Sequence, residues 1–260
     1  MEITPLGDSA LLIRVVEDFE SAPENALNKV LATKQTLEAA KIPGAIEATP
    51  AYTSVAVFYD PIRAIDAGAP VDGVLEWLEN KIREASRDTN DLAGAATKSV
   101  IEIPVCYDNE FALDLEDVAR HAGIASKEVI DLHCGAEYRV HCVGFTGGFP
   151  FLGGLPPKLA TPRKDVPRKE IPAGSVAIGG RQTGIYPIKS PGGWHVIGRT
   201  PQRLFDATKN PPTLLQAGDR VRFRAITRDE FERSTIEPTG VERDGRAARR
   251  GELSGESESS

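Results

Sequence analysis

The stretch GFTGGFPFLGGLPPKLATPRKDVPRKEIPAGSVAIGGRQTGIYPIKSPGGWHVIGR, at residues 144–199, says most about the architecture of this chain. Between Gly144 and Gly198 it contains twelve glycines and eight prolines. This composition permits only short strands joined by tight turns. The stretch therefore predicts a β-barrel or a β-sandwich, with candidate strands at 175–180, 184–189 and 194–199. Farther along, the alternating pattern GDRVRFRAIT at 218–227 predicts one more strand of the same unit.

The first part of the chain has a different pattern, in which strand and helix signals alternate. Strand patterns lie at 9–16, 46–49 and 52–59, and apolar residues recur with helical spacing at 23–41 and 71–85. The resulting order, β-α-β-β-α, predicts a small two-layer α/β domain of the split βαβ kind.

A short polar segment separates these two patterns. Residues 88–98, DTNDLAGAATK, have the small and polar composition of an interdomain linker. We therefore predict an α+β fold, with an N-terminal α/β domain over 1–95 and a β-barrel domain over 96–230. Apolar residues become sparse after Arg228, and we predict a disordered tail over 231–260.

Charge and composition limit the functions that this chain can have. Its 260 residues carry a net charge of -7, which gives no general attraction to nucleic acid or to an anionic membrane surface. No apolar run approaches the roughly 18 residues of a membrane span, and the N-terminus lacks the pattern of a signal peptide. Three cysteines cannot form a disulfide framework and favour a reducing compartment. We expect a cytoplasmic protein that binds neither nucleic acid nor membrane.

Two His-Cys pairs, His133-Cys134 and His141-Cys142, are the most conspicuous candidates for metal ligands. Adjacent residues on a strand point to opposite faces, so His141 and Cys142 are poorly placed to hold one metal ion. We expect buried thiols and partly exposed imidazoles here and no metal site. The phosphate-loop, nucleophile-elbow and zinc-helix motifs are also absent, and we assign no catalytic nucleophile.

The glycine- and proline-rich stretch combines aromatic residues with polar ones, as small-ligand pockets do. Arg199 could bind a carboxylate in bidentate fashion, and Gln182 or Thr183 could hydrogen-bond an amide. The alternative is that the phenylalanines form the barrel core and the arginines are solvated. The aromatic candidates are Phe145, Phe149, Phe151, Tyr186 and Trp194, and the polar ones are Arg181, Gln182, Thr183 and Arg199.

A basic segment lies inside the same stretch. Residues 158–170, KLATPRKDVPRKE, contain five basic residues and two acidic ones. This composition is that of a solvated loop or of a docking surface.

The chain resembles a known family, the B subunits of bacterial 5-oxoprolinase, which also includes the KipI and allophanate hydrolase subunit 1 proteins. The matching segments begin with PLGDSALLI and PGAIEATPAYTSVAVFYDP and extend through the glycine- and proline-rich stretch to LLQAGDRVRF. Together they span residues 5–226. The resemblance implies an N-terminal α/β domain followed by a cyclophilin-like β-barrel.

The resemblance also implies a reaction and partners. The A, B and C subunits of the family's complex together hydrolyse 5-oxo-L-proline to L-glutamate with ATP, and Mg is expected to accompany ATP at the level of the complex. Opening a stable lactam requires activation, for which phosphorylation of the amide oxygen would create a leaving group. The B subunit resembles one half of the carboxyltransferase module of urea amidolyase, so we expect a non-autonomous protein with the A and C subunits of 5-oxoprolinase as partners.

This chain departs from the family pattern at two places. Where relatives commonly read PGFPYLGG, it has Phe151 in place of the tyrosine, which argues against an acid or base at that position. Its His-Cys pairs are local substitutions, which argues against a family metal site. We expect a substrate-binding or interface role for seven residues: His133, Arg181, Gln182, Thr183, Tyr186, Trp194 and Arg199.

Two other functions fit the same resemblance. KipI-like members inhibit the autophosphorylation of a histidine kinase, which would place a peptide on the aromatic patch. A urea- or allophanate-type carboxyltransferase would instead need a biotinyl partner, because no biotin-carrier segment is recognisable in this chain.

Overall fold

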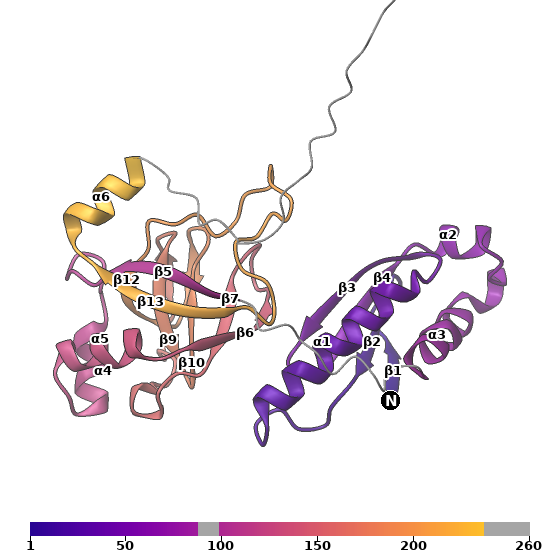
Figure 1. Cartoon of the computed structure of the whole chain (residues 1–260), viewed down its shortest axis with the longest axis horizontal. Coiled ribbons are helices and arrows are strands. Elements are labelled where there is room, and N and C mark those ends of the chain that lie inside the picture. Colours follow the sequence, from indigo (N-terminus) through magenta and orange to yellow (C-terminus); the bar gives the residue numbers. More distant parts are fainter. Residues whose placement is uncertain (88–98, 237–260) are drawn as a thin grey trace, which may run out of the picture.

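A computed structural model describes residues 1–87 and 99–236 of the chain (Figure 1). The N-terminal part is an antiparallel sheet with strand order β1-β2-β4-β3. Because β2 and β3 each pair antiparallel with β4, they run parallel to each other with β4 between them. The unit β2-α1-β3 is therefore the predicted split βαβ arrangement. The strands are β1 (Glu2–Pro5), β2 (Ala10–Arg14), β3 (Ala45–Ala51) and β4 (Ser54–Tyr59).

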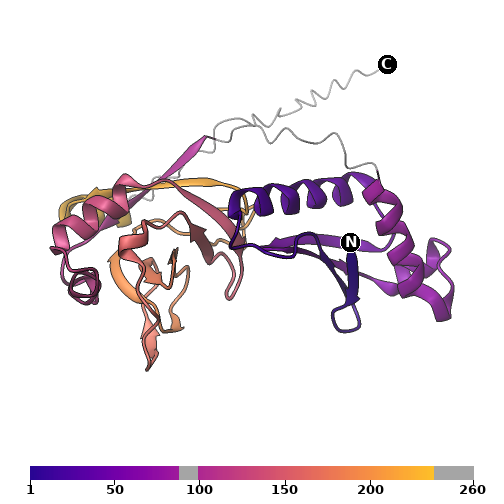
Figure 2. The same cartoon turned by 90° about the horizontal axis from the view of Figure 1, so that it is seen from below.

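Helices cover one face of this sheet (Figure 2). The long helix α1 (Pro23–Ala40) buries Leu27, Val30 and Leu37, which recur at helical spacing and pack into the core of the N-terminal part. Helix α3 (Val74–Ala85) follows a 3-10 turn at Val71–Gly73.

Two elements of the N-terminal part were not expected from the sequence. One is the edge strand β1, and the other is the short helix α2 (Pro61–Asp66), which follows Asp60 directly. The Asp60 carboxylate accepts hydrogen bonds from the backbone N–H groups of Ile62 (2.9 Å) and Arg63 (3.3 Å). An aspartate N-cap followed by proline is a strong helix start, and the helix forms for this reason.

The C-terminal part is a closed barrel, which confirms the predicted α+β fold class. The strand order around the barrel is β10-β7-β6-β13-β5-β12-β9, and β8 and β11 form a separate two-stranded sheet. The strands expected at 175–180, 194–199 and 218–227 correspond to β9, β12 and β13. The strand expected at 184–189 is wrong for most of its length, because β10 (Gln182–Ile185) ends before Pro187, which has no N–H group to donate to a strand partner. The bounds are β5 (Val100–Cys106), β6 (Tyr138–Val143), β7 (Pro150–Gly153), β8 (Arg168–Ile171), β9 (Ser175–Gly179), β10 (Gln182–Ile185), β11 (Ser190–Gly192), β12 (His195–Arg199) and β13 (Arg220–Ile226).

Two helices, α4 (Leu115–Ala122) and α5 (Ser126–Gly135), pack against each other and against the barrel. Helix α4 contacts β12, and α5 contacts β13. Val118 and Val129 join the barrel core, in which Tyr138 and Phe223 are among the largest fully buried side chains. A 3-10 turn at Pro157–Leu159 contacts both helices.

The last described element, α6 (Arg228–Ile236), corrects the predicted start of the tail. Phe231 is buried, and its ring centre lies 4.6 Å from that of Phe111, so this segment is folded against the barrel. Local composition could not reveal this contact, because Phe111 is more than a hundred positions away. The remainder of the predicted tail, 237–260, and the predicted linker at 88–98 with its boundary at 95 lie outside the described residues.

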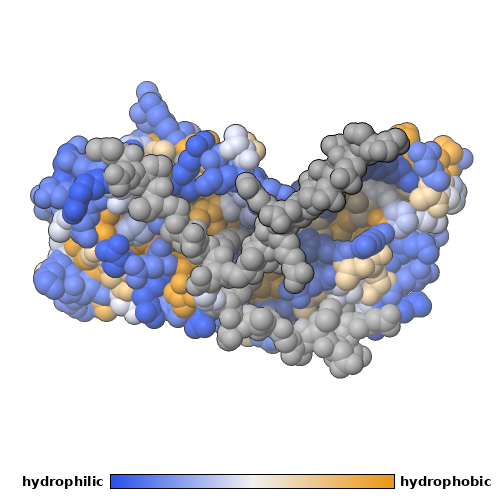
Figure 3. All heavy atoms as spheres, turned by 45° about the horizontal axis from the view of Figure 1, so that its top comes forward, coloured by the Kyte–Doolittle hydropathy of each residue, from blue (hydrophilic) through white to orange (hydrophobic). Residues whose placement is uncertain are grey.

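The two parts of the molecule lie side by side, and β3 of the sheet contacts β6 of the barrel (Figure 1). The surface mixes hydrophilic residues with small hydrophobic patches over both parts (Figure 3). Within the described ranges, no helix combines the length and the apolar character needed to cross a bilayer.

Candidate functional site

A hollow of about 260 Å³ opens on the barrel and is lined mainly by aromatic side chains. Phe149 lies at its centre, with ring centres 5.1 Å from Tyr186 and 5.6 Å from Trp194, both in edge-to-face geometry. Such contacts are favourable because the positive edge of one ring meets the negative face of another. The aromatic lining residues are Phe145, Phe149, Phe151, Tyr186 and Trp194, all five of the aromatic candidates from the sequence.

Glycines of the barrel strands make room for these rings. A Cβ atom at Gly179 would lie 2.5 Å from the indole of Trp194, and one at Gly184 would lie 2.9 Å from the ring of Phe149. A Cβ at Gly192 would collide with the Tyr186 hydroxyl. The glycines of the stretch therefore do more than form turns, since they let the aromatic walls lie directly on the backbone.

Two cationic side chains, those of Arg163 and Lys164, also line the hollow. Neither was among the predicted site residues. The guanidinium carbon of Arg163 lies 5.8 Å from the Trp194 ring centre, within the range of a cation–π contact. The signal in the sequence was the basic segment 158–170, which composition alone assigned to a solvated loop or a docking surface. Only the fold shows that two of its five basic residues reach an aromatic hollow.

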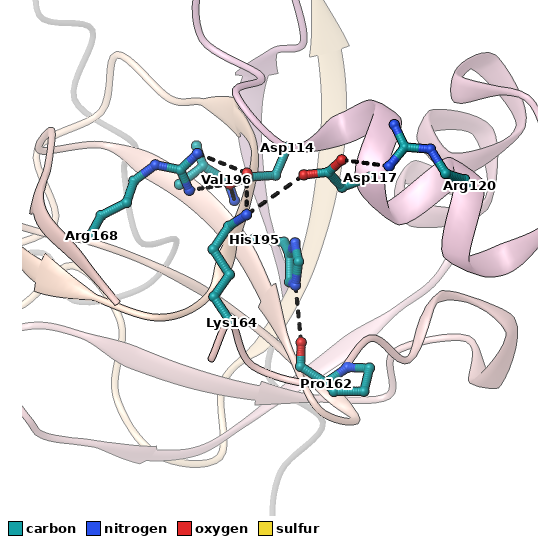
Figure 4. Close-up of polar contacts among 8 residues, drawn as sticks. All are labelled: Asp114, Asp117, Arg120, Pro162, Lys164, Arg168, His195 and Val196. Atoms are coloured by element: carbon teal, nitrogen blue, oxygen red, sulfur yellow. Dashed lines mark hydrogen bonds and ion pairs between the residues drawn. The ribbon is translucent and has the colours of Figure 1, made fainter. Parts of the chain in front are cut away.

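The buried carboxylate of Asp114 anchors the loop that carries these cations (Figure 4). It forms a bidentate pair with Arg168, at 2.6 and 2.8 Å, and an ion pair with Lys164 Nζ at 2.7 Å. The backbone N–H of Val196 donates to the same carboxylate at 2.8 Å. Burial opposes the ionisation of Asp114, but the bonds from Arg168, Lys164 and Val196 outweigh it and hold the pKa of this carboxyl below its ordinary value.

Asp114 occupies the N-cap position of α4, but its side chain makes no capping hydrogen bond. The carboxylate instead binds the two partly exposed cations and the Val196 amide, because hydrogen bonds to charged donors are stronger than those to neutral backbone N–H groups.

Asp114, Asp117 and His195 also form the one group of potential metal ligands within the described residues. Their ligand atoms lie within 4.8 Å of one another, but Lys164 Nζ lies 2.7 Å from Asp114 and 3.6 Å from Asp117. The Nε2 atom of His195 donates to the Pro162 carbonyl at 3.0 Å (Figure 4). The cationic side chains already neutralise these acids, so the cluster serves as an ion-pair anchor for the loop.

His133 lies outside the hollow, fully buried within the barrel and stacked on Phe223 with ring centres 4.4 Å apart. Its Nδ1 lies 2.8 Å from the Tyr107 hydroxyl, and its Nε2 lies 3.1 Å from the Thr183 hydroxyl. Burial lowers the pKa of His133 to about 3, so the imidazole is neutral at pH 7.

The positions of the protons in this buried series of hydrogen bonds follow from the groups at its two ends. Thr183 donates its hydroxyl hydrogen to the Ala177 carbonyl at 3.0 Å, so it must accept from His133 Nε2. Nδ1 then accepts from Tyr107, which in turn accepts from the Cys134 thiol at 3.5 Å. The Thr183–His133 pair is consequently not an activated nucleophile and its base, because the hydroxyl proton points away from the imidazole and both residues are buried.

Two other predicted site residues, Arg199 and Arg181, lie outside the hollow. The Nε atom of Arg199 donates to the Ala173 carbonyl at 2.9 Å, and its guanidinium carbon lies 5.8 Å from the Phe111 ring centre. Arg181 is exposed, and a guanidinium nitrogen of its side chain lies 3.6 Å from a carboxylate oxygen of the exposed Glu20. Neither lines the hollow, so of the seven residues only Tyr186 and Trp194 do.

Gln182 lies where the two parts of the molecule meet. Its side-chain amide is 3.1–3.2 Å from the hydroxyl of Tyr52, which belongs to the turn between β3 and β4. The Phe151 ring, which lines the hollow, has its centre 6.4 Å from that of Tyr52.

The two His-Cys pairs do not form a joint ligand group among the described residues. All three cysteines are free, and burial raises the pKa of Cys142 to about 11, so this thiol is protonated at neutral pH. His141 packs over Gly153 and against Phe19, with ring centres 4.8 Å apart for the latter pair. These side chains pack where the N-terminal part meets the barrel.

The fold and the hollow together define a two-part α+β protein whose closed barrel carries an aromatic hollow. The chain belongs to the family of the carboxyltransferase domain, subdomain C and D, which matches residues 1–215. This confirms the family resemblance inferred from the sequence.

Two curated relatives are both named as the B subunit of 5-oxoprolinase. The chain is 43% identical over 235 residues to the one from Bacillus subtilis (strain 168), an alignment that covers 88% of this chain and 95% of the relative. It is 55% identical over 123 residues to the one from Haemophilus influenzae, covering 47% of this chain and 58% of that protein. Both names designate one component of an enzyme with several subunits.

Solved structures agree with this fold. TTHA0988 superposes with a TM-score of 0.67 at 38% identity, covering 84% of this chain and 40% of that longer one. The urea amidolyase of K. lactis gives a TM-score of 0.66 at 20% identity, covering 90% of this chain and 15% of that protein. The second likeness concerns the fold alone.

Proposed function

We propose that this chain is the B subunit of a 5-oxoprolinase and acts only together with partner subunits. The observation that carries the proposal is the 43% identity to the Bacillus subtilis relative over 95% of that protein. The complete reaction converts 5-oxo-L-proline, ATP and water to L-glutamate, ADP and phosphate.

The size and walls of the hollow support a role in holding the substrate. Its volume of about 260 Å³ lies below the roughly 300–1,000 Å³ of pockets for drug-sized ligands. A small lactam fits this scale, whereas a whole nucleotide does not. The hollow would therefore hold the lactam and not the nucleotide, and ATP with its Mg is required at the level of the complex.

The chemistry that this proposal requires is activation of the ring amide. Phosphoryl transfer to the amide oxygen breaks the terminal phosphoanhydride bond of ATP and releases ADP. Water then attacks the activated carbon, the ring C–N bond breaks with transfer of a proton to the nitrogen, and the product is γ-glutamyl phosphate. A second water hydrolyses this acyl phosphate, which releases phosphate and leaves the side-chain carboxylate of glutamate. On the chain described here, the aromatic walls would exclude bulk water and orient the ring, which protects the activated species from premature hydrolysis.

The proposal is tested by reconstitution. Glutamate release and ATP hydrolysis are measured for this chain alone, with the A subunit, with the C subunit and with both. We expect activity only in the complete mixture. A stable complex without activity on 5-oxoproline would refute the proposal, and turnover of urea with a biotinyl partner would assign the carboxyltransferase function instead. Inhibition of a histidine kinase in the absence of any complex would favour the KipI-like function.

A further inference from the structure

We propose that Arg163 is the carboxylate-binding residue of the aromatic hollow, which therefore selects small cyclic ligands that carry one carboxylate. This inference rests on the proposed function for its choice of probe, 5-oxo-L-proline. It transfers to Arg163 the carboxylate-binding role that the sequence suggested for Arg199.

The first argument is the difference between Arg163 and three of the four other cations of its loop; the fourth, Lys169, does not line the hollow. Lys164 and Arg168 are both engaged by Asp114, and Lys158 pairs with Glu128 at 3.0 Å. Arg163 makes no ion pair or hydrogen bond to any described residue, and its contact is with the face of Trp194. Its planar donors are thus available to a ligand at the hollow, and their fork geometry matches a carboxylate.

The second argument is that the backbone on both sides of Arg163 is held in place. The backbone N–H of Lys164 donates to the Gly193 carbonyl at 2.8 Å, on one side of Arg163. On the other side, the Pro162 carbonyl accepts from His195 (Figure 4). The backbone around Arg163 is therefore ordered before any ligand binds, which lowers the entropy that binding costs.

The third argument concerns the polar group on the opposite wall. Burial raises the pKa of Tyr186, against the opposing effects of a hydrogen bond from the Trp194 backbone N–H and the charge of Arg163. The hydroxyl is therefore neutral at pH 7. A neutral hydroxyl can donate its hydrogen to a second ligand oxygen. A carboxylate at Arg163 and a lactam carbonyl oxygen near Tyr186 would place the ring methylenes against Phe149 and Trp194.

Trp194 provides a direct measurement of binding. The chain has two tryptophans, so Trp77→Phe leaves Trp194 as the only indole. In this background, the fluorescence of Trp194 is titrated with 5-oxo-L-proline and with pyrrolidin-2-one, the same lactam without a carboxylate. The same ligand is also tested as substrate of the reconstituted complex, where KM and kcat are determined separately.

We expect Arg163→Met to weaken the binding of 5-oxo-L-proline at least about tenfold, which is the loss expected for a hydrogen-bonded charge. Arg163→Lys should recover part of this loss, because it restores the charge without the planar fork. Pyrrolidin-2-one should bind to the parent protein at least about tenfold more weakly than 5-oxo-L-proline does. Its affinity for Arg163→Met should equal its affinity for the parent protein. Lys169→Met removes an exposed charge of the same loop outside the hollow and should change nothing.

The outcomes separate this inference from the proposed function. If the complex produces glutamate but Arg163→Met alters neither the Trp194 titration nor KM, the inference is wrong and the proposed function stands. If Arg163→Met weakens only the association with the A and C subunits, Arg163 is an interface residue and the inference is also wrong. If a panel of small ring carboxylates binds with the expected dependence on Arg163 while the complex makes no glutamate, the site stands and the proposed function fails.

Discussion

The hydroxyl of Tyr52 lies 3.1 Å from the side-chain nitrogen of Gln182 and 3.2 Å from its oxygen, joining the N-terminal sheet to the barrel. Tyr52 has a φ of 42°, a conformation uncommon for a residue with a side chain. Its ring meets Phe19 edge-to-face at 5.1 Å and lies near Phe151 in the wall of the hollow. The turn of the N-terminal hairpin therefore supports one wall of the hollow from outside the barrel.

The first prediction concerns this contact. Tyr52→Phe keeps the ring but removes the hydroxyl, and we expect the free energy of unfolding to fall by about 1 kcal/mol, the typical worth of a hydrogen bond. A double-mutant cycle with Gln182→Met, measured by urea unfolding, should give a coupling energy of about 0.5–1.5 kcal/mol. Additive effects of the two substitutions would show that the two side chains do not interact in solution.

The second prediction concerns the anchor of the basic loop. Asp114→Asn removes the charge that holds Arg168 and Lys164, and leaves Lys164 with only its longer ion pair to Asp117 at 3.6 Å. We expect a loss of about 3 kcal/mol, at the lower end for breaking a buried ion pair, because both cations are partly exposed. Asp117→Asn is the control, and its effect should stay below about 1 kcal/mol. Equal effects of the two substitutions in thermal or urea unfolding would contradict the anchoring role.

The third prediction concerns the space beneath Trp194. Gly179→Ala places a methyl group 2.5 Å from the indole, which must then move. We expect a loss of stability of about 1–3 kcal/mol from overpacking and a changed emission maximum of Trp194. Gly135→Ala, at the end of α5 with no atom within 4 Å of the added Cβ, is the matched control and should change neither quantity. An unaltered Trp194 spectrum in Gly179→Ala would mean that the ring does not lie on this glycine.

The fourth prediction concerns pH. The pKa of His133 is lowered by burial to about 3, below the unfolded value of about 6.5, so the unfolded chain binds the proton more readily between these values. The contribution of the neutral imidazole is fully present above pH 6.5 and is lost as the pH falls. For His133 alone, the free energy of unfolding should decrease by up to about 1.4 kcal/mol per pH unit below pH 6.

This slope can be assigned to its residue. Urea unfolding at pH 7, 6 and 5 should show a smaller pH dependence for His133→Gln than for the parent protein. His121→Gln, an exposed position on α4, is the control. A slope that His133→Gln leaves unchanged would assign the acid sensitivity to other groups, of which His141 is the first candidate, because burial also lowers its pKa to about 4.

Much of the fold could be predicted from local patterns. The alternation of strand and helix signals over 9–85 predicted the split βαβ unit, and the glycines and prolines of 144–198 predicted the short strands of a barrel. Such features depend on neighbours within a few positions, which the sequence states directly. The helix α6 escaped prediction because Phe231 is stabilised by Phe111, a partner distant in sequence.

The site was less predictable, as its arginines show. Arg199 and Arg163 both lie near aromatic residues in the sequence, and nothing local distinguishes their roles. In the fold, Arg199 is engaged by the Ala173 carbonyl on another side of the barrel, while Arg163 is placed over Trp194 by a loop that Asp114 anchors. Asp114 itself has the sequence signature of an N-cap, yet its carboxylate binds cations some fifty positions away.

The sequence by itself therefore determined the order and type of most elements, the aromatic character of the hollow and the family to which the chain belongs. Tertiary structure alone decided which polar groups meet those aromatic rings, that His133 is a buried link between Tyr107 and Thr183, and that Tyr52 reaches across to Gln182. The physical reason is the range of the interactions. Helix, strand and turn preferences act between near neighbours, whereas ion pairs, buried hydrogen bonds and ring contacts join residues that only the closing of the barrel brings together.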